Sequence, residues 1–101
     1  MKKIILFILL VLNITLFADL IDDGLAEFAN GNYEQSRQLF QESCNTGDAD
    51  GCLHLGAIYL ITTEDISPNY KLAAQAFKKA CDNGEKIACK KYNHYKNIAN
   101  N

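Results

Sequence analysis

The hydrophobic residues of this 101-residue chain recur with helical spacing over most of its length. One stripe follows the i, i+3, i+4, i+7 pattern that places side chains on a single face of an α-helix. It comprises Tyr70, Ala73, Ala74, Phe77, Ala80 and Cys81. Shorter stripes of the same kind run through residues 21–28, 52–59 and 88–99, and no alternating apolar and polar run indicates a β-strand. The pattern predicts an all-α fold.

Three glycines mark where helices end. Gly31, Gly47 and Gly84 each follow a helical segment, and glycine tolerates the left-handed backbone that closes a helix C-terminus. Together with the hydrophobic stripes they divide the chain into five predicted helices. These helices span residues 20–29, 33–45, 49–62, 68–82 and 85–99.

Polar residues supply start signals for three of these helices. Asn32, with Gln35 three residues later, resembles a capping box. Asp48 precedes the third helix, and its carboxylate can accept backbone N–H groups of the first turn. Ser67 followed by Pro68 suits an N-cap and the first helical position, where the missing N–H of proline leaves no bond unmade.

The cysteines belong to an internal repeat. Each pair is eight positions apart, and the second pair follows the first at an offset of 37: Cys44 and Cys52, then Cys81 and Cys89. Further identities at this offset are Asn32 and Asn69, Tyr33 and Tyr70, Phe40 and Phe77, and Gly47 and Gly84. A period of this length is typical of helical-hairpin solenoids. The chain is therefore predicted to form two α/α hairpins, residues 33–62 and 68–99, with residues 20–29 as a capping helix.

The repeat also predicts which cysteines pair. In each unit one cysteine lies in the last turn of a helix, a glycine follows, and the second cysteine lies near the start of the next helix. A short connection makes the two helices antiparallel neighbours, which can bring the Cα atoms within the roughly 4.4–6.8 Å that a disulfide needs. Of the three pairings that four cysteines allow, only Cys44–Cys52 with Cys81–Cys89 treats the two units alike.

Metal binding and catalysis are the competing roles for the polar residues. Zinc hairpins usually space their ligands about two to four residues apart, whereas seven residues separate the cysteines of each pair. His54 and His94 are 40 positions apart, and no C-x-x-C redox motif occurs. No serine has a lysine three residues after it, as serine β-lactamases require. We expect no metal, no cofactor and no catalytic residue.

The amino terminus has the order of a signal peptide. Two lysines precede an apolar run over residues 4–17, which ends at Ala18 before acidic residues begin at Asp19. This run is shorter than the roughly 20 residues that a membrane span needs. We expect residues 1–18 to be cleaved, leaving a periplasmic or secreted domain, residues 19–101, without stable membrane insertion. The alternative is an uncleaved anchor, which also exports the rest of the chain.

Charge is divided unevenly between the two halves of the chain. Between Asp19 and Leu60 eight acidic residues accompany Arg37 alone, whereas residues 61–101 carry seven lysines and four acidic residues. The acidic half would repel phosphate, which argues against nucleic-acid binding. The lysines of the second half form either a solvated helix face or a contact with an anionic surface.

Two segments carry a family resemblance. They are Leu55-Gly56-Ala57-Ile58-Tyr59 and the run from Tyr70 to Cys89, which includes Lys78-Lys79-Ala80-Cys81-Asp82-Asn83-Gly84. These segments resemble the Sel1-like repeat family, and the cysteine spacing is similar to its exported cysteine-rich branch, the Helicobacter cysteine-rich proteins. The resemblance covers residues 24–92 and implies stacked α/α hairpins with one disulfide each. The connection 61–67 departs from the family pattern because it lacks Gly-x-Gly.

Two functional hypotheses follow. The first is a module that binds an envelope or extracellular protein, because solenoids offer surface rather than a deep pocket. The second is a β-lactam-binding protein or weak β-lactamase with a β-lactam or peptidoglycan-like ligand, which the resemblance alone implies. Tyr92 and Tyr95 are the candidate partner contacts, since tyrosine is enriched at interfaces. The alternative is that both tyrosines pack back onto the helix that carries Phe77.

Cleavage of the signal peptide is directly testable. Protein purified from the cell envelope is expected to have the intact mass of a chain that starts at Asp19, because the charged, apolar and small-residue regions occur in the order of a signal peptide. A mass that retains residues 1–18 would contradict cleavage.

Overall fold

The computed structural model describes the backbone of residues 2–101 and the side chains of residues 2–9 and 19–101. Its helices are α1 (Lys2–Ala29), α2 (Tyr33–Asn45), α3 (Ala49–Ile58), α4 (Tyr70–Asp82) and α5 (Lys86–Ala99). No strand occurs within residues 2–101, so the predicted all-α fold is confirmed. No helix within this described part of the chain is long and apolar enough to cross a bilayer.

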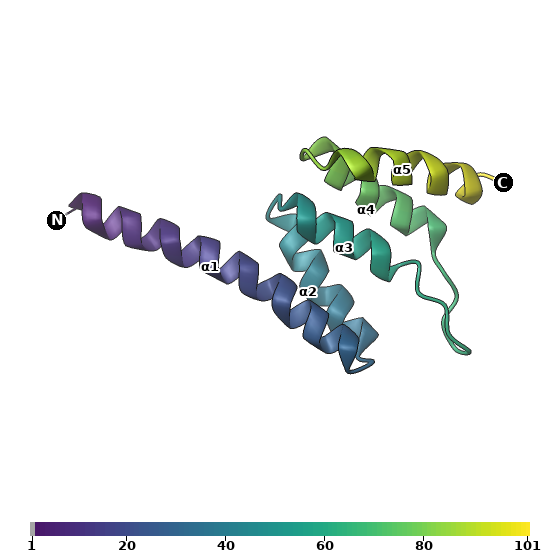
Figure 1. Ribbon diagram of the computed structural model, residues 1–101, viewed down its shortest axis with the longest axis horizontal. Helices are drawn as coiled ribbons and strands as arrows, with labels where there is room; N and C mark the ends of the chain where they lie inside the picture. The colour runs from purple at the N-terminus through teal and green to yellow at the C-terminus, as the bar shows by residue number, and fades with distance from the viewer. Residues whose placement is uncertain (1) are drawn as a thin grey trace.

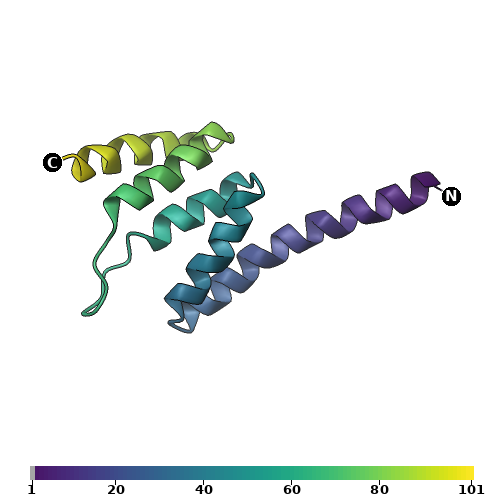
Figure 2. The same ribbon diagram turned by 180° about the vertical axis from the view of Figure 1, so that it is seen from behind.

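The helices form two layers. Each helix packs on the next along the chain, from α1 on α2 to α4 on α5. In Figure 1 α1, α3 and α5 lie nearer the viewer, with α2 and α4 behind them. The reverse view in Figure 2 brings α2 and α4 to the front. The hairpins α2–α3 and α4–α5 are thus stacked side by side, as the repeat predicts.

The first helix is longer than the predicted capping helix. It begins at Lys2 and runs without a break through residues 20–29. Only its C-terminal part reaches α2, where Gly24 is buried and its carbonyl oxygen accepts a hydrogen bond of 2.7 Å from the Ser36 hydroxyl. Residues 20–29 therefore cover the outer side of the first hairpin, whereas residues 2–9 project away from it (Figure 1).

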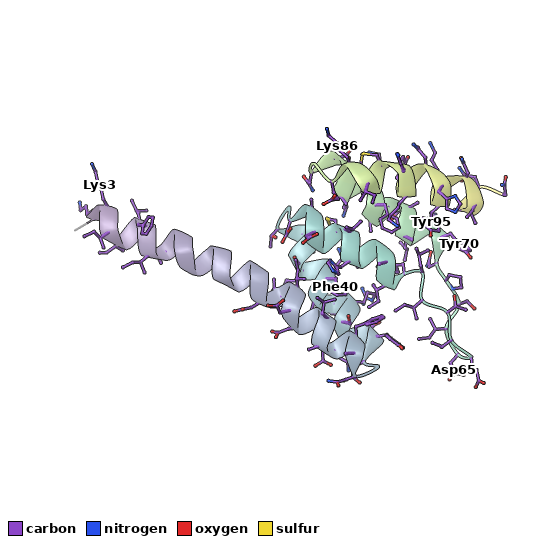
Figure 3. The ribbon with its side chains drawn as sticks, in the orientation of Figure 1. Lys3, Phe40, Asp65, Tyr70, Lys86 and Tyr95 are labelled. Carbon is purple, nitrogen blue, oxygen red and sulfur yellow. A yellow bond between two sulfur atoms is a disulfide. The ribbon has the colours of Figure 1, made fainter. Side chains whose placement is uncertain are left out.

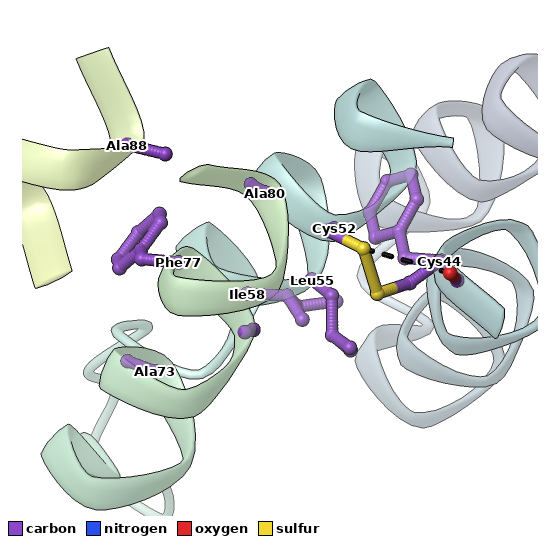
Figure 4. Packing of buried hydrophobic residues seen from close by; sticks show 10 residues of the cluster. Cys44, Cys52, Leu55, Ile58, Ala73, Phe77, Ala80 and Ala88 are labelled. Carbon is purple, nitrogen blue, oxygen red and sulfur yellow. Dashed lines mark hydrogen bonds between the residues drawn. A yellow bond between two sulfur atoms is a disulfide. The ribbon is translucent and has the colours of Figure 1, made fainter. Parts of the chain in front are cut away.

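Two phenylalanine rings set the spacing between neighbouring helices of the stack. Phe40 of α2 is 2% exposed and lies against Gly24 of α1, and Phe77 of α4 is 1% exposed and lies against Gly56 of α3. A Cβ atom on either glycine would stand 2.5 Å from a ring carbon. Figure 4 shows the Phe77 ring between the alanines at positions 73 and 88. These contacts require glycine because only its missing side chain leaves room for the ring.

α3 ends at Ile58, so its predicted end at residue 62 is wrong. Bonds of the tighter i to i−3 type follow its last residues and close the helix. They run from the Leu60 N–H to the Ala57 carbonyl and from the Ile61 N–H to the Ile58 carbonyl. The next carbonyl, that of Tyr59, accepts the N–H of Asn69 at 2.7 Å. This bond joins the two ends of the connection between α3 and α4.

The predicted N-cap at Ser67 is also wrong. α4 begins at Tyr70, and the Asn69 side chain accepts the N–H of Leu72 at 3.0 Å. Because the Asn69 N–H is bonded to the carbonyl of Tyr59, Asn69 stays outside the helix as its cap. Pro68 therefore lies in the connection rather than at the first helical position.

Of the remaining predicted helix signals, the capping box at Asn32 is wrong, whereas the cap at Asp48 and the helix-ending glycines are confirmed. The capping box at Asn32 is absent, because the Asn32 amide donates to Glu27 of α1 at 2.8 Å and leaves α2 without a side-chain cap. The Asp48 cap is confirmed, with its carboxylate accepting the Asp50 N–H at 3.0 Å. The predicted left-handed residues are Gly31, Gly47 and Gly84, with φ of 80°, 89° and 108°.

Gly56→Ala tests the ring-on-glycine contact. Alanine favours a helix, but its Cβ would meet the Phe77 ring, so the free energy of unfolding is expected to fall by about 1–3 kcal/mol in urea denaturation. Asn93→Ala is the matched control, because Asn93 follows Gly56 by 37 positions and is exposed on α5. Its stability is expected to stay unchanged or to rise. A stabilised Gly56→Ala variant would contradict the packing.

Candidate functional site

The two disulfides close the two hairpins as the repeat predicts. Cys44–Cys52 joins α2 to α3 with a Cα–Cα distance of 4.4 Å, and Cys81–Cys89 joins α4 to α5 at 4.8 Å. The first bridge is buried and the second is half-buried. Disulfides persist in oxidising environments, so the two bridges indicate an oxidising compartment.

Small residues allow the paired helices to approach beside each bridge. Gly51 of α3 lies directly against Ser43 of α2, and a Cβ atom there would collide with the serine side chain. The corresponding positions of the second hairpin are Ala88 and Ala80, both 0% exposed. The close approach of the helices therefore recurs in both repeats, although the residue types differ.

A crevice opens between α4 and α5 of the second hairpin. Its volume is about 210 Å³, and three lysines and a tyrosine are prominent in its lining. The lining residues are Lys71, Ala74, Gln75, Lys78, Tyr92, Lys96, Ala99 and Asn100. The Lys96 ammonium lies 5.5 Å from the centre of the Tyr92 ring, and Lys78 pairs with Asp82 at 3.3 Å. The predicted contact residue Tyr92 thus lies in a cationic hollow.

The first hairpin has a corresponding crevice with a different lining. Its residues are Tyr33, Glu34, Arg37, Ile58, Tyr59, Ile61, Ile66, Ser67 and Asn69. Five of them lie between the end of α3 at Ile58 and the start of α4 at Tyr70, and this connection lines one side of the hollow. Arg37 forms an ion pair with Glu34, which lowers the pKa of Glu34 and raises the pKa of Arg37. At the offset of 37, Lys71 replaces Glu34 and Lys96 replaces Tyr59. The second crevice has consequently lost this ion pair and gained positive charge.

Tyr95 packs against aromatic rings of α4. Its ring stacks on those of Tyr70 and Phe77, with distances between ring centres of 6.0 Å and 5.7 Å. The His94 ring meets it edge-on, with 4.8 Å between the ring centres. Figure 3 shows Tyr70 and Tyr95 next to each other at the carboxyl end of α5. Tyr92 and Tyr95 are both half-buried and packed against the core, and Tyr92 also borders the crevice.

A third hollow lies between α1 and α3. We call it the apolar groove; its volume is about 220 Å³, and six of its seven lining residues are hydrophobic. They are Leu25, Phe28, Phe40, Ala57, Ile58 and Ile61, and the seventh is His54. The His54 ring lies 5.1 Å from that of Phe40, and its Nδ1 is 2.8 Å from the carbonyl oxygen of Asp50. Figure 3 shows Phe40 in the space between the two helices.

The histidines and acidic residues do not gather into a metal site. His54 lies on α3 and His94 on α5, and each contacts an aromatic ring of its own hairpin. Within the described residues, no group of three or more His, Cys, Asp or Glu side chains is placed to hold a metal ion.

Comparisons with protein-family models, curated proteins and solved structures find no match.

The hollows were not predicted from the sequence, because several helices contribute to each lining. One signal for the crevice was present in the repeat itself: the substitution of Glu34 by Lys71 at equivalent positions.

The two disulfides are expected to differ in accessibility. Cys81–Cys89 is half-buried and should open first under mild reductant, whereas the buried Cys44–Cys52 should open only when the domain unfolds. The measurement is thiol alkylation followed by peptide mass mapping. Opening of the buried bridge first would contradict the placement.

Removing either bridge is expected to lower the free energy of unfolding by about 2–4 kcal/mol, since each closes a short loop in a small domain. Lys90→Ala on the exposed face of α5 serves as the control and should change it by less than about 0.5 kcal/mol.

Proposed function

We propose that this chain is an exported, disulfide-stabilised protein of the Sel1-like type that acts as a protein-interaction module in the periplasm or outside the cell. The proposed contact surface is the crevice between α4 and α5, with Lys71, Tyr92 and Lys96 as its principal groups. The proposed partner is a protein that presents an acidic segment.

The observation that carries this proposal is the difference between the two crevices. In the first repeat the hollow is lined by the connection before α4 and by the Glu34–Arg37 ion pair, so its cationic group is paired with a carboxylate. In the second repeat the lining residues include three lysines and no acidic residue. Lysine ammonium groups on either side can bind carboxylates, and the Tyr92 ring offers an amphipathic surface of the kind enriched at interfaces.

Binding agrees better with this lining than hydrolysis does. The crevice residues include no serine or cysteine nucleophile and no histidine base. The apolar groove contains one histidine beside hydrophobic side chains, without a nucleophile in its lining. The proposed β-lactam chemistry of the cysteine-rich Sel1-like branch therefore has no support in these two hollows.

Charge reversal in the crevice tests the proposal. Immobilised wild-type protein is expected to capture an acidic envelope protein. The Lys71→Glu/Lys96→Glu double variant is expected to capture at least about tenfold less of it, because its new carboxylates repel those of the partner. Quantitative mass spectrometry of the eluates measures this. Lys79→Glu is the matched control, since Lys79 is an exposed lysine of α4 outside this crevice.

Equal capture by the wild type and the double variant would contradict the proposed surface. Turnover of a chromogenic cephalosporin at about 1 per second or faster, absent after heat denaturation, would contradict the proposed class of function.

A further inference from the structure

The apolar groove exists because the two repeats fill equivalent spaces differently. In the second repeat the Phe77 ring is covered by Tyr95, with 5.7 Å between the ring centres, and by the Lys91 ammonium, whose Nζ lies 5.8 Å from the centre of the Phe77 ring. At the offset of 37 the first repeat has Ile58 and His54 in these places. Both side chains are smaller or shorter than their counterparts, and the hollow beside Phe40 remains open.

An apolar stripe lies on α5, on the same side of the molecule as this groove. Ile87 is 56% exposed and Ile98 is 38% exposed, with His94 between them at helical spacing. At the offset of 37, His94 corresponds to Ala57 and Ile98 to Ile61, which both line the groove. The stripe and the groove consequently belong to the layer formed by α1, α3 and α5 (Figure 1).

The groove and the stripe carry opposite charges at their borders. Asp22 and Asp50 are exposed, and each lies one helical turn before a residue that lines the groove. Lys86 and Lys90 are exposed one on each side of Ile87 along α5. Because α1, α3 and α5 run in the same direction (Figure 1), a parallel approach would bring the basic start of α5 to the acidic end of the groove.

We propose that the apolar groove is occupied by α5 of a second copy of this chain. Ile87 and Ile98 of one copy would enter the groove of the other, with lysines meeting the carboxylates at its end. A helix laid in an apolar groove through spaced hydrophobic anchors is an established mode of recognition. Because one face carries both elements, two copies can exchange them in a closed two-fold pair. This dimer lies on a different face from the crevice and needs no envelope partner.

Sedimentation equilibrium of the oxidised protein, purified from the envelope as the cell processes it, tests the pairing. The wild type is expected to form dimers that weaken with added salt. Leu25→Glu in the groove and Ile87→Glu on the stripe are each expected to raise the dissociation constant at least about tenfold. Both positions are exposed in the single copy, so circular dichroism should show unchanged helix content.

Leu72→Glu is the matched control, because Leu72 is 36% exposed on α4 in the opposite layer.

The decisive experiment mixes the Leu25→Glu and Ile87→Glu variants. Leu25→Glu keeps its stripe and Ile87→Glu keeps its groove, so the mixture should form a heterodimer with one intact contact, whereas neither variant pairs with itself. Ile98→Glu provides a second stripe variant if Ile87→Glu unfolds. A wild-type monomer at its highest soluble concentration, dimers unaffected by both variants, or a mixture that stays monomeric would overturn the proposal.

Discussion

The stack depends on two aromatic rings that rest on glycines of the preceding helix. Apart from Leu55 and Ile58, the other buried side chains are small ones of alanine, serine and cysteine. Phe40 on Gly24 fixes the first hairpin against α1, and Phe77 on Gly56 fixes the second hairpin against the first. Because close-packed interiors leave no free volume, a Cβ atom at either glycine forces a ring to move and disturbs a whole interface.

The disulfides have a different role from the rings. Each bridge acts within one hairpin, at the end where two antiparallel helices turn, and neither crosses between hairpins. A domain of this size buries a small apolar core, so stability from crosslinks matters more than in a larger protein. Bridges thus hold each hairpin closed, whereas ring-on-glycine contacts determine how one hairpin sits on the next.

Several features that depend on local sequence were predicted, whereas contacts between helices were predicted only where the internal repeat revealed them. The positive φ of Gly47 and the cap at Asp48 are local, and both were predicted correctly. Asn32 lost its capping role because Glu27 of another helix binds its amide, and no spacing rule reveals that competition. The pairing of the cysteines followed from the repeat, whereas the apolar groove requires knowing that Leu25 of α1 comes close to Ala57 of α3.

The internal repeat separates positions that both units share from positions where the two units differ. The residues that fix how the helices pack are the same in both units, and they include the tyrosine at the helix start, the buried phenylalanine and both cysteines. Two positions that differ in chemistry line hollows of the first repeat: Glu34 becomes Lys71, and Ile58 becomes Tyr95. The two repeats therefore share one packing scheme and present different chemistry at equivalent surfaces.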